Sequence, residues 1–115
     1  MQFSLLLNKN KNMKLLTKEI EQRFKEIGDQ SEKTTEDTIV VCKFFNPTGA
    51  GNWYATEYYP ESQIFFGYVS IFGDHNDELG EFSLKELEEY KGMLGLGIER
   101  DRHFTETTLD KVMTK

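Results

Sequence analysis

Residues 53–72, WYATEYYPESQIFFGYVSIF, decide the fold. Two runs rich in aromatic and β-branched residues, 53–59 and 63–72, are typical of β-strands. Because only the short connection 60–62 separates them, we expect the two strands to pair antiparallel. Gly67, in the middle of the second run, indicates a bulge or a close approach by another group.

Two further strands are predicted around this pair. The run 38–45, TIVVCKFF, is apolar on both faces and β-branched at its start, which is typical of an interior strand. Residues 46–52 are dense in turn-forming residues and lead from it into the 53–59 strand. After a turn at 73–77, residues 78–82 predict a short fourth strand.

Helices are predicted at 17–27, 84–91 and 108–113. Apolar residues recur at helical spacing in the first, which begins after the candidate N-cap Thr17. Ser83 and Glu86 match a capping box at the start of the second helix. The chain therefore predicts an α+β fold: an antiparallel meander of about four strands, with two main helices packed on it and a short C-terminal helix.

The bulk properties indicate one soluble domain. The chain has 115 residues, which we divide into a flexible leader at 1–12 and a single α+β domain at 13–115. The net charge of −6 argues against non-specific nucleic-acid binding, because phosphates are bound by basic surfaces. No apolar run is long enough to span a membrane. The single cysteine, Cys42, excludes an internal disulfide and fits a reducing, cytoplasmic compartment.

No motif predicts catalysis, a cofactor or a metal. The glycine-rich stretches 49–51 and 95–97 lack the signature of a phosphate-binding loop and are expected to be turns. Residues 74–78, DHNDE, begin like a calcium loop but lack its sixth-position glycine and twelfth-position glutamate, so we expect a solvated turn. Cys42 lies in the middle of a predicted strand and is expected to be a buried structural thiol.

One group of residues is a candidate ligand site. By strict alternation along 53–59, Glu57 shares a face with Trp53 and Tyr59, so it lies among aromatic rings. It can form an ion pair with Arg100 or Arg102, or contact a ligand directly. The polar segment 99–103 supplies the other candidates. The predicted ligand-binding residues are Trp53, Tyr54, Glu57, Arg100, Asp101 and His103.

Several stretches together resemble a known family. They are 53–57 (WYATE), 65–69 (FFGYV), 78–84 (ELGEFSL) and 98–101 (IERD). Over about 13–108 the chain is similar to a small family of uncharacterised proteins, described as a domain of unknown function, found on plasmids, conjugative elements and phages. The resemblance implies a prokaryotic or phage-infected cell as the setting. It implies no activity and no catalytic residues.

Three hypotheses of function remain open, and an oligomer is possible under each. The first is a non-enzymatic protein that captures a nucleotide-like anionic ligand to counter host defence. The second is an inhibitor of a host defence or nucleic-acid-processing protein. The third is a small hydrolase, which requires Glu57, Asp101 and His103 to converge within hydrogen-bond reach. The acidic face of the second hypothesis consists of Glu78, Glu81, Glu86, Glu88 and Glu89.

Overall fold

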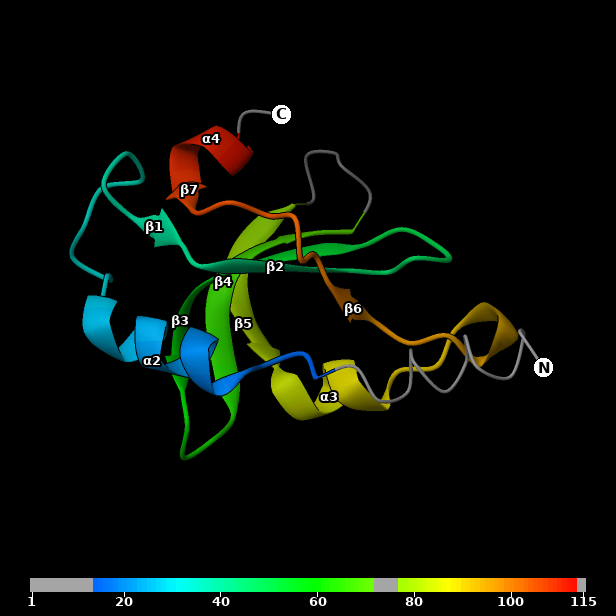
Figure 1. Cartoon of the computed structure of the whole chain (residues 1–115). Coiled ribbons are helices and arrows are strands. Elements are labelled where there is room, and N and C mark those ends of the chain that lie inside the picture. The colour runs from blue at the N-terminus through cyan, green and yellow to red at the C-terminus, as the bar shows by residue number, and fades with distance from the viewer. Residues whose placement is uncertain (1–13, 72–76, 114–115) are drawn as a thin grey trace.

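The fold is built on a five-stranded antiparallel sheet. A computed structural model describes residues 14–71 and 77–113, and its strands follow the order β5-β4-β3-β2-β6 (Figure 1). The strands of this sheet are β2 (Cys42–Phe45), β3 (Asn52–Tyr59), β4 (Ile64–Ser70), β5 (Glu78–Ser83) and β6 (Glu99–Arg100). The predicted leader 1–12, the end of the third predicted strand at residue 72 and most of the turn 73–77 lie outside the described residues.

Within the described residues, a small second sheet, three α-helices and a 3-10 turn at Met93–Gly95 complete the α+β fold. The predicted fold class is therefore confirmed, and the predicted interior strand 38–45 is divided at Val41 into two pieces. Its first piece leaves the main sheet because it pairs with β7, a strand that the sequence pattern did not predict. These elements are β1 (Ile39–Val40), β7 (Thr107–Thr108), α2 (Lys18–Ile27), α3 (Leu84–Glu89) and α4 (Leu109–Met113).

One face of the sheet, the covered face, packs against α2 and α3. Phe65 of β4 is fully buried at its centre. The ring centroid of Phe65 lies 5.2 Å from that of Phe44 and 4.8 Å from that of Tyr58. Phe24 of α2 and Leu87 of α3 belong to the same apolar cluster. Burial of these large side chains is the main source of stability for so small a domain.

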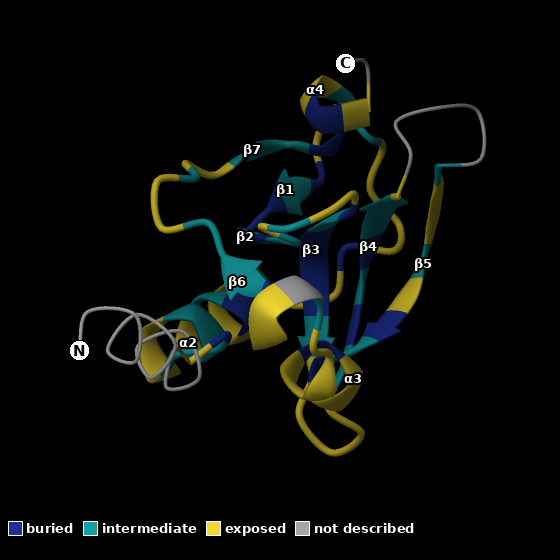
Figure 2. Cartoon of the chain, turned by 90° about the vertical axis from the view of Figure 1, so that its right-hand side faces the viewer, coloured by how far each residue is buried: buried dark blue, intermediate teal, exposed yellow. Residues whose placement is uncertain are grey.

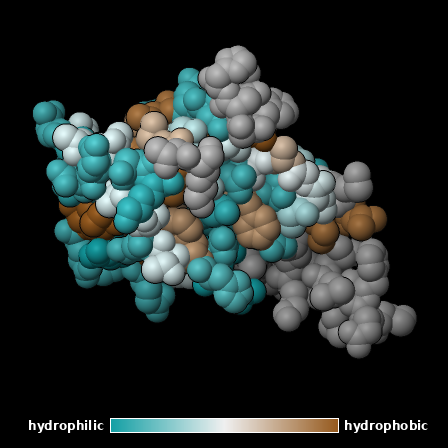
Figure 3. Space-filling model, turned by 90° about the horizontal axis from the view of Figure 1, so that it is seen from above, coloured by the Kyte–Doolittle hydropathy of each residue, from teal (hydrophilic) through white to brown (hydrophobic). Residues whose placement is uncertain are grey.

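The opposite face is covered along part of its length. Val40, Tyr54, Leu109 and Val112 form a second buried cluster, which packs β1 and α4 over this face. Figure 1 shows α4 on the side of the sheet opposite to α2 and α3. On the side seen from above, apolar side chains reach the surface in small separate patches among hydrophilic ones (Figure 3). Apolar side chains that reach the surface singly are normal for a folded protein.

A β-bulge in β3 changes which side chains face the covered side. Ala55 lies opposite Gly67, but Glu57 lies opposite Phe66, so Thr56 is an extra residue in β3. Trp53 therefore packs with the covered-face cluster, whereas Glu57 is on the other face. The prediction that these two residues share a face is wrong, because strict alternation fails across a bulge.

Gly67 permits the close approach that its position predicted. A Cβ atom on Gly67 would lie 1.8 Å from the carbonyl oxygen of Tyr54. That contact is with backbone, which cannot move aside as a flexible side chain can. The bulge itself lies in the partner strand β3, next to this approach.

None of the helices within the described ranges is both long and apolar enough to cross a membrane.

The first prediction compares two glycines that lie opposite each other. Gly67→Ala should lower the free energy of unfolding by about 2 kcal/mol or more, because the added methyl group collides with β3 backbone. Gly80→Ala, the matched control in β5, has nothing within 4 Å of its new Cβ. Its effect should stay within about 0.5 kcal/mol. Urea unfolding measures both, and equal losses would contradict the steric account.

Candidate functional site

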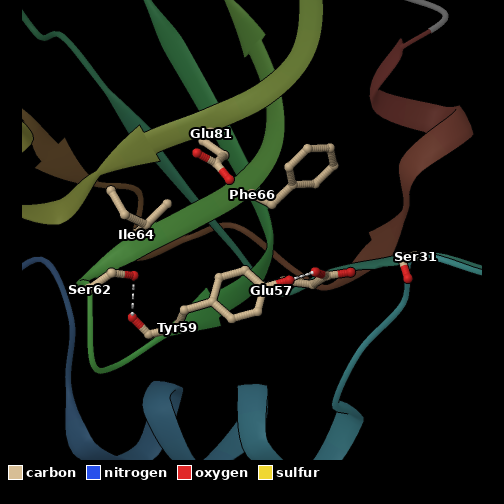
Figure 4. A pocket seen from close by; sticks show the side chains of 7 residues that line it. All are labelled: Ser31, Glu57, Tyr59, Ser62, Ile64, Phe66 and Glu81. Atoms are coloured by element: carbon tan, nitrogen blue, oxygen red, sulfur yellow. Dashed lines mark hydrogen bonds between the residues drawn. The ribbon is translucent and has the colours of Figure 1, made fainter.

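An open pocket lies on the part of the sheet that α4 and β1 leave uncovered. Its volume is about 650 Å³. Glu57 and Tyr59 come from β3, Ile64 and Phe66 from β4, and Glu81 from β5. Figure 4 shows the Tyr59 hydroxyl pointing at the Glu57 carboxylate, with Ser31 and Ser62 at the sides. We call this the acid–aromatic pocket, defined by Ser31, Glu57, Tyr59, Ser62, Ile64, Phe66 and Glu81.

Glu57 is a buried carboxylate that has no cationic partner among the residues that the structure describes. It is 6% exposed, and its Oε2 accepts a 2.8 Å hydrogen bond from the backbone N–H of Gln30. Its Oε1 accepts a hydrogen bond from the Tyr59 hydroxyl. Within residues 14–71 and 77–113, no lysine or arginine forms an ion pair with it. Two neutral donors therefore hold this carboxylate in place without neutralising it.

Tyr59 is held as a hydrogen-bond donor. Its hydrogen bond to the Glu57 carboxylate, together with partial burial, raises its pKa to about 12. The negative charges of Glu57, Asp29 and Glu81 act in the same direction. The tyrosine is thus neutral at physiological pH, and the residue, which is 43% exposed, lines the pocket.

Gln30 connects the loop after α2 to the bulge. Its side chain is 2% exposed, and its Nε2 donates to the carbonyl oxygens of Ile39 at 2.9 Å and Thr56 at 2.8 Å. Its Oε1 accepts from the N–H of Ile39 at 2.8 Å. The amide therefore bonds backbone groups of β1 and β3, two strands that do not pair with each other directly. Gln30 lies in the polar stretch 28–37, where no local sequence pattern distinguishes it.

A second hollow adjoins the first on the far side of the Glu57–Tyr59 pair. Its volume is about 320 Å³, and both of those residues also line it. Hydrogen bonds from Ser31 lower the pKa of Asp29, so this carboxylate is negatively charged at neutral pH. One lysine, Lys25, lies among several acids of this hollow: Glu21, Asp29, Glu57 and Glu61.

The two predicted aromatic ligand contacts take part in the packing. Trp53 packs with the covered-face cluster. Tyr54 is 7% exposed, and its ring lies 6.3 Å from that of Phe104 and 6.1 Å from that of Tyr68. Neither ring lines the acid–aromatic pocket. Phe66 and Tyr59 supply the aromatic surface there instead.

The predicted ion pair of Glu57 with Arg100 or Arg102 does not form between these described residues. The guanidinium of Arg100 donates to the carbonyl oxygens of Lys14 and Leu15, which ties the start of the described chain to β6. Arg100 pairs with Phe44 in the sheet, at the same level as Trp53. Glu57 lies on another strand, at least ~10 Å further along by strand geometry.

Arg100, Asp101 and His103 do come together around Phe45, in a separate pocket of about 320 Å³. Asp101 lies 3.8 Å from Lys43 and accepts a 2.9 Å hydrogen bond from the backbone N–H of His103. Glu57 does not line this pocket. The arrangement therefore gives no support to a hydrolase in which Glu57 acts with Asp101 and His103.

Within the described residues, neither the Cys42 thiol nor a metal-binding cluster gives a second candidate site. Cys42 is buried, as predicted, and burial raises the pKa of its thiol to about 12, so it is not a nucleophile at neutral pH. Among the described residues, no three histidine, cysteine, aspartate or glutamate side chains are placed to hold a metal ion. Most of the calcium-like stretch 74–78 lies outside those residues.

Fold and site together define a small α+β protein with a pocket, lined by two glutamates and two aromatic residues, on one partly open sheet face. The chain belongs to the family described as "Protein of unknown function (DUF2958)", whose model matches residues 15–112. No curated protein and no solved structure matches the chain.

The second prediction concerns Gln30. Gln30→Glu should lower the free energy of unfolding by about 2–4 kcal/mol, because a carboxylate cannot donate to the buried carbonyls of Ile39 and Thr56. Gln22→Glu, the same change at an exposed position of α2, is the matched control and should stay within about 0.5 kcal/mol. Urea unfolding at pH 7 measures both. A loss no larger than that of the control would contradict the role of Gln30.

The third prediction concerns pH. The folded pKa of Tyr59 is about 12, above the value near 10 of an unperturbed tyrosine, so its hydrogen bond stabilises the fold fully below pH 10. The stability difference between the natural chain and Tyr59→Phe should therefore be constant up to that pH and shrink as pH rises toward 12. Urea unfolding of both proteins at several pH values measures it. The other tyrosines titrate in both proteins, so their contribution cancels in the stability difference. A stability difference that widens as pH rises would contradict the raised pKa of Tyr59.

Proposed function

We propose that this chain is a non-enzymatic binding protein, and that its acid–aromatic pocket receives a cationic side chain, arginine or lysine, from a partner protein. The observation that carries the proposal is Glu57, a buried carboxylate at an open pocket that forms no ion pair within the described part of the chain. A second carboxylate, Glu81, and the rings of Tyr59 and Phe66 line the same pocket. This is the chemistry that recognises guanidinium and ammonium groups.

The charge of the surroundings favours a cation over an anion. Acidic side chains outnumber basic ones across the pocket and the adjoining hollow. The chain as a whole carries −6. An anionic ligand in this pocket would face two carboxylates and no cation among the lining residues. A cation gains from both carboxylates and also from stacking on an aromatic face.

A protein partner suits the shape of the pocket better than a free small molecule does. Sites for small molecules enclose most of the ligand surface. Here Tyr59 and Glu81 are exposed, and the pocket lies open on a sheet face. A side chain that arrives on a partner surface would be enclosed by that surface, and water would then be excluded from Glu57.

This proposal develops the acidic-face hypothesis, with a change of residues. The five glutamates of that hypothesis are all exposed, but Glu81 points to the pocket side of β5 while Glu78 points to the other side. The proposed contact therefore rests on Glu81 with Glu57. Capture of a nucleotide-like anion stays a prediction with less support, since Arg100 already binds carbonyl oxygens and Trp53 is packed in the core cluster.

The resemblance to proteins of plasmids, conjugative elements and phages adds a setting to this proposal. In that setting the partner would be a host protein in the cytoplasm, and its inhibition would benefit the element.

The fourth prediction tests the pocket with a charge-matched pair of ligands. A capped peptide with one arginine between threonine and valine residues should bind, as measured by calorimetry. Its citrulline analogue, which has the same shape without the charge, should bind about tenfold more weakly. Glu81→Gln should weaken the arginine peptide, because it removes one of the two carboxylates.

Glu88→Gln is the matched control, since Glu88 is exposed on α3 and does not line the pocket. It should leave binding unchanged. Equal weakening by Glu81→Gln and Glu88→Gln would show a general charge effect and contradict the proposal. Adenosine nucleotides form the third arm of the titration. Binding of a nucleotide without binding of the arginine peptide would favour the anion hypothesis instead.

A further inference from the structure

The strand β5 forms one end of the main sheet. It pairs with β4 along its whole length, from Ser83 opposite Ile64 to Glu78 opposite Val69. No other strand of the described residues pairs with its outer side. In Figure 2 no labelled helix or strand lies beyond β5. Within the described residues, the outer edge of this strand is therefore unpaired.

An exposed edge presents backbone groups in a regular row. In an antiparallel sheet, about half of the N–H and C=O groups of an end strand point away from its neighbour. Such groups are a template for a further strand. The pairing of β5 with β4 has no register shift, in contrast to the bulged pairing of β3 with β4. The outer row of β5 is therefore regular enough to accept a strand in register.

The usual protections of an edge are few on this strand. Proline, lysine and bulges are common devices against unwanted pairing, and residues 78–83, ELGEFS, contain neither of these residues and no bulge. Gly80 has open space where a side chain would stand. The charges on this strand are negative, on Glu78 and Glu81, so they repel an acidic strand and attract a basic one.

The alternation of side chains connects this edge to the acid–aromatic pocket. Leu79 lies opposite Tyr68, and Glu81 lies opposite Phe66, so both point to the pocket face of the sheet. Leu79 is 41% exposed, and Glu81 lines the pocket itself. A strand added beside β5 would place two of its side chains, two residues apart, next to Leu79 and Glu81.

A second copy of the chain fits this edge poorly. Two copies each carry −6. Opposite residues of a strand pair share a face of the sheet, so an antiparallel pairing of two β5 strands centred on Leu79 would place Glu81 of each copy opposite Asp77 of the other. Like charges directly opposite each other destabilise a strand pair. A basic segment of a different protein avoids this repulsion.

We propose that the partner of this protein binds as an extended segment that adds a strand to the outer edge of β5, with an apolar residue beside Leu79 and a basic residue, two positions away, beside Glu81. The backbone of the segment pairs with β5, and its basic side chain enters the acid–aromatic pocket. This inference rests on the proposed function and specifies the conformation of the partner. Backbone pairing supplies affinity, and the pocket supplies the choice of side chain.

The test uses N-methylation, which blocks strand pairing along one edge of a peptide. The probe is a capped seven-residue peptide in which one arginine and one valine, two residues apart, alternate with threonines. One derivative carries N-methyl groups on the arginine and valine amides, and the other carries them on two threonine amides. In an extended strand these two sets point to opposite edges. One derivative should therefore bind about tenfold more weakly than the parent, and the other should bind about as well.

Hydrogen exchange gives an independent reading on the folded protein. Binding of the parent peptide should slow exchange of backbone amides in β5 and leave those of β6, the strand at the opposite end of the sheet, unchanged. If both N-methylated peptides bound as well as the parent, or if both lost the same affinity, the addition of a strand to β5 would be ruled out. If the parent peptide still bound more tightly than its citrulline analogue, the proposed function would survive that result.

Two further outcomes are decisive. Absence of binding by the parent peptide would overturn the proposed function, and this inference with it. Sedimentation equilibrium that finds a dimer, with β5 amides protected in the dimer alone, would assign the edge to a second copy and overturn the basic-segment proposal.

Discussion

The tie between the Gln30 side chain and the bulge in β3 is the interaction on which the site depends. The amide bonds the carbonyl oxygen of Thr56, the extra residue, and bonds Ile39 through both its N–H and its C=O. Each of these backbone groups would otherwise be buried without a partner, at a cost of about 1–3 kcal/mol per group. One side chain thus stabilises the bulge and fixes the loop after α2 against the sheet.

The position of Glu57 follows from this tie. The bulge turns Glu57 to the partly open face, and the backbone N–H of Gln30 then holds the carboxylate there. Tyr59 lies on the same face and donates to the other oxygen. A carboxylate placed by neutral donors keeps its attraction for a cation, whereas an ion pair with Arg100 would have removed it. The proposed binding site and the fold are therefore linked through a single local irregularity.

Much of the fold could be predicted from local patterns, and the site only in part. The runs 53–59 and 63–72 and the helices at 17–27 and 84–91 were placed within a few residues, because periodicity and capping are local signals. Glu57 was singled out correctly as a carboxylate among aromatic rings, but it was assigned to the wrong face. Gln30, Phe66 and Glu81 were not assigned to a ligand site. Their roles come from neighbours across the sheet, which the sequence pattern does not identify.

The sequence by itself determined the α+β class, the pairing of the central hairpin, the acidic balance of the chain and the buried thiol of Cys42. Each depends on composition or on spacing over a few residues, where geometry is the same in every protein. The tertiary structure alone decided that Trp53 and Glu57 lie on opposite faces, that Arg100 binds the carbonyls of residues 14 and 15, and that β5 has an exposed edge. These features arise from contacts between distant segments. One extra residue in β3 reverses the face of every side chain that follows it in the strand.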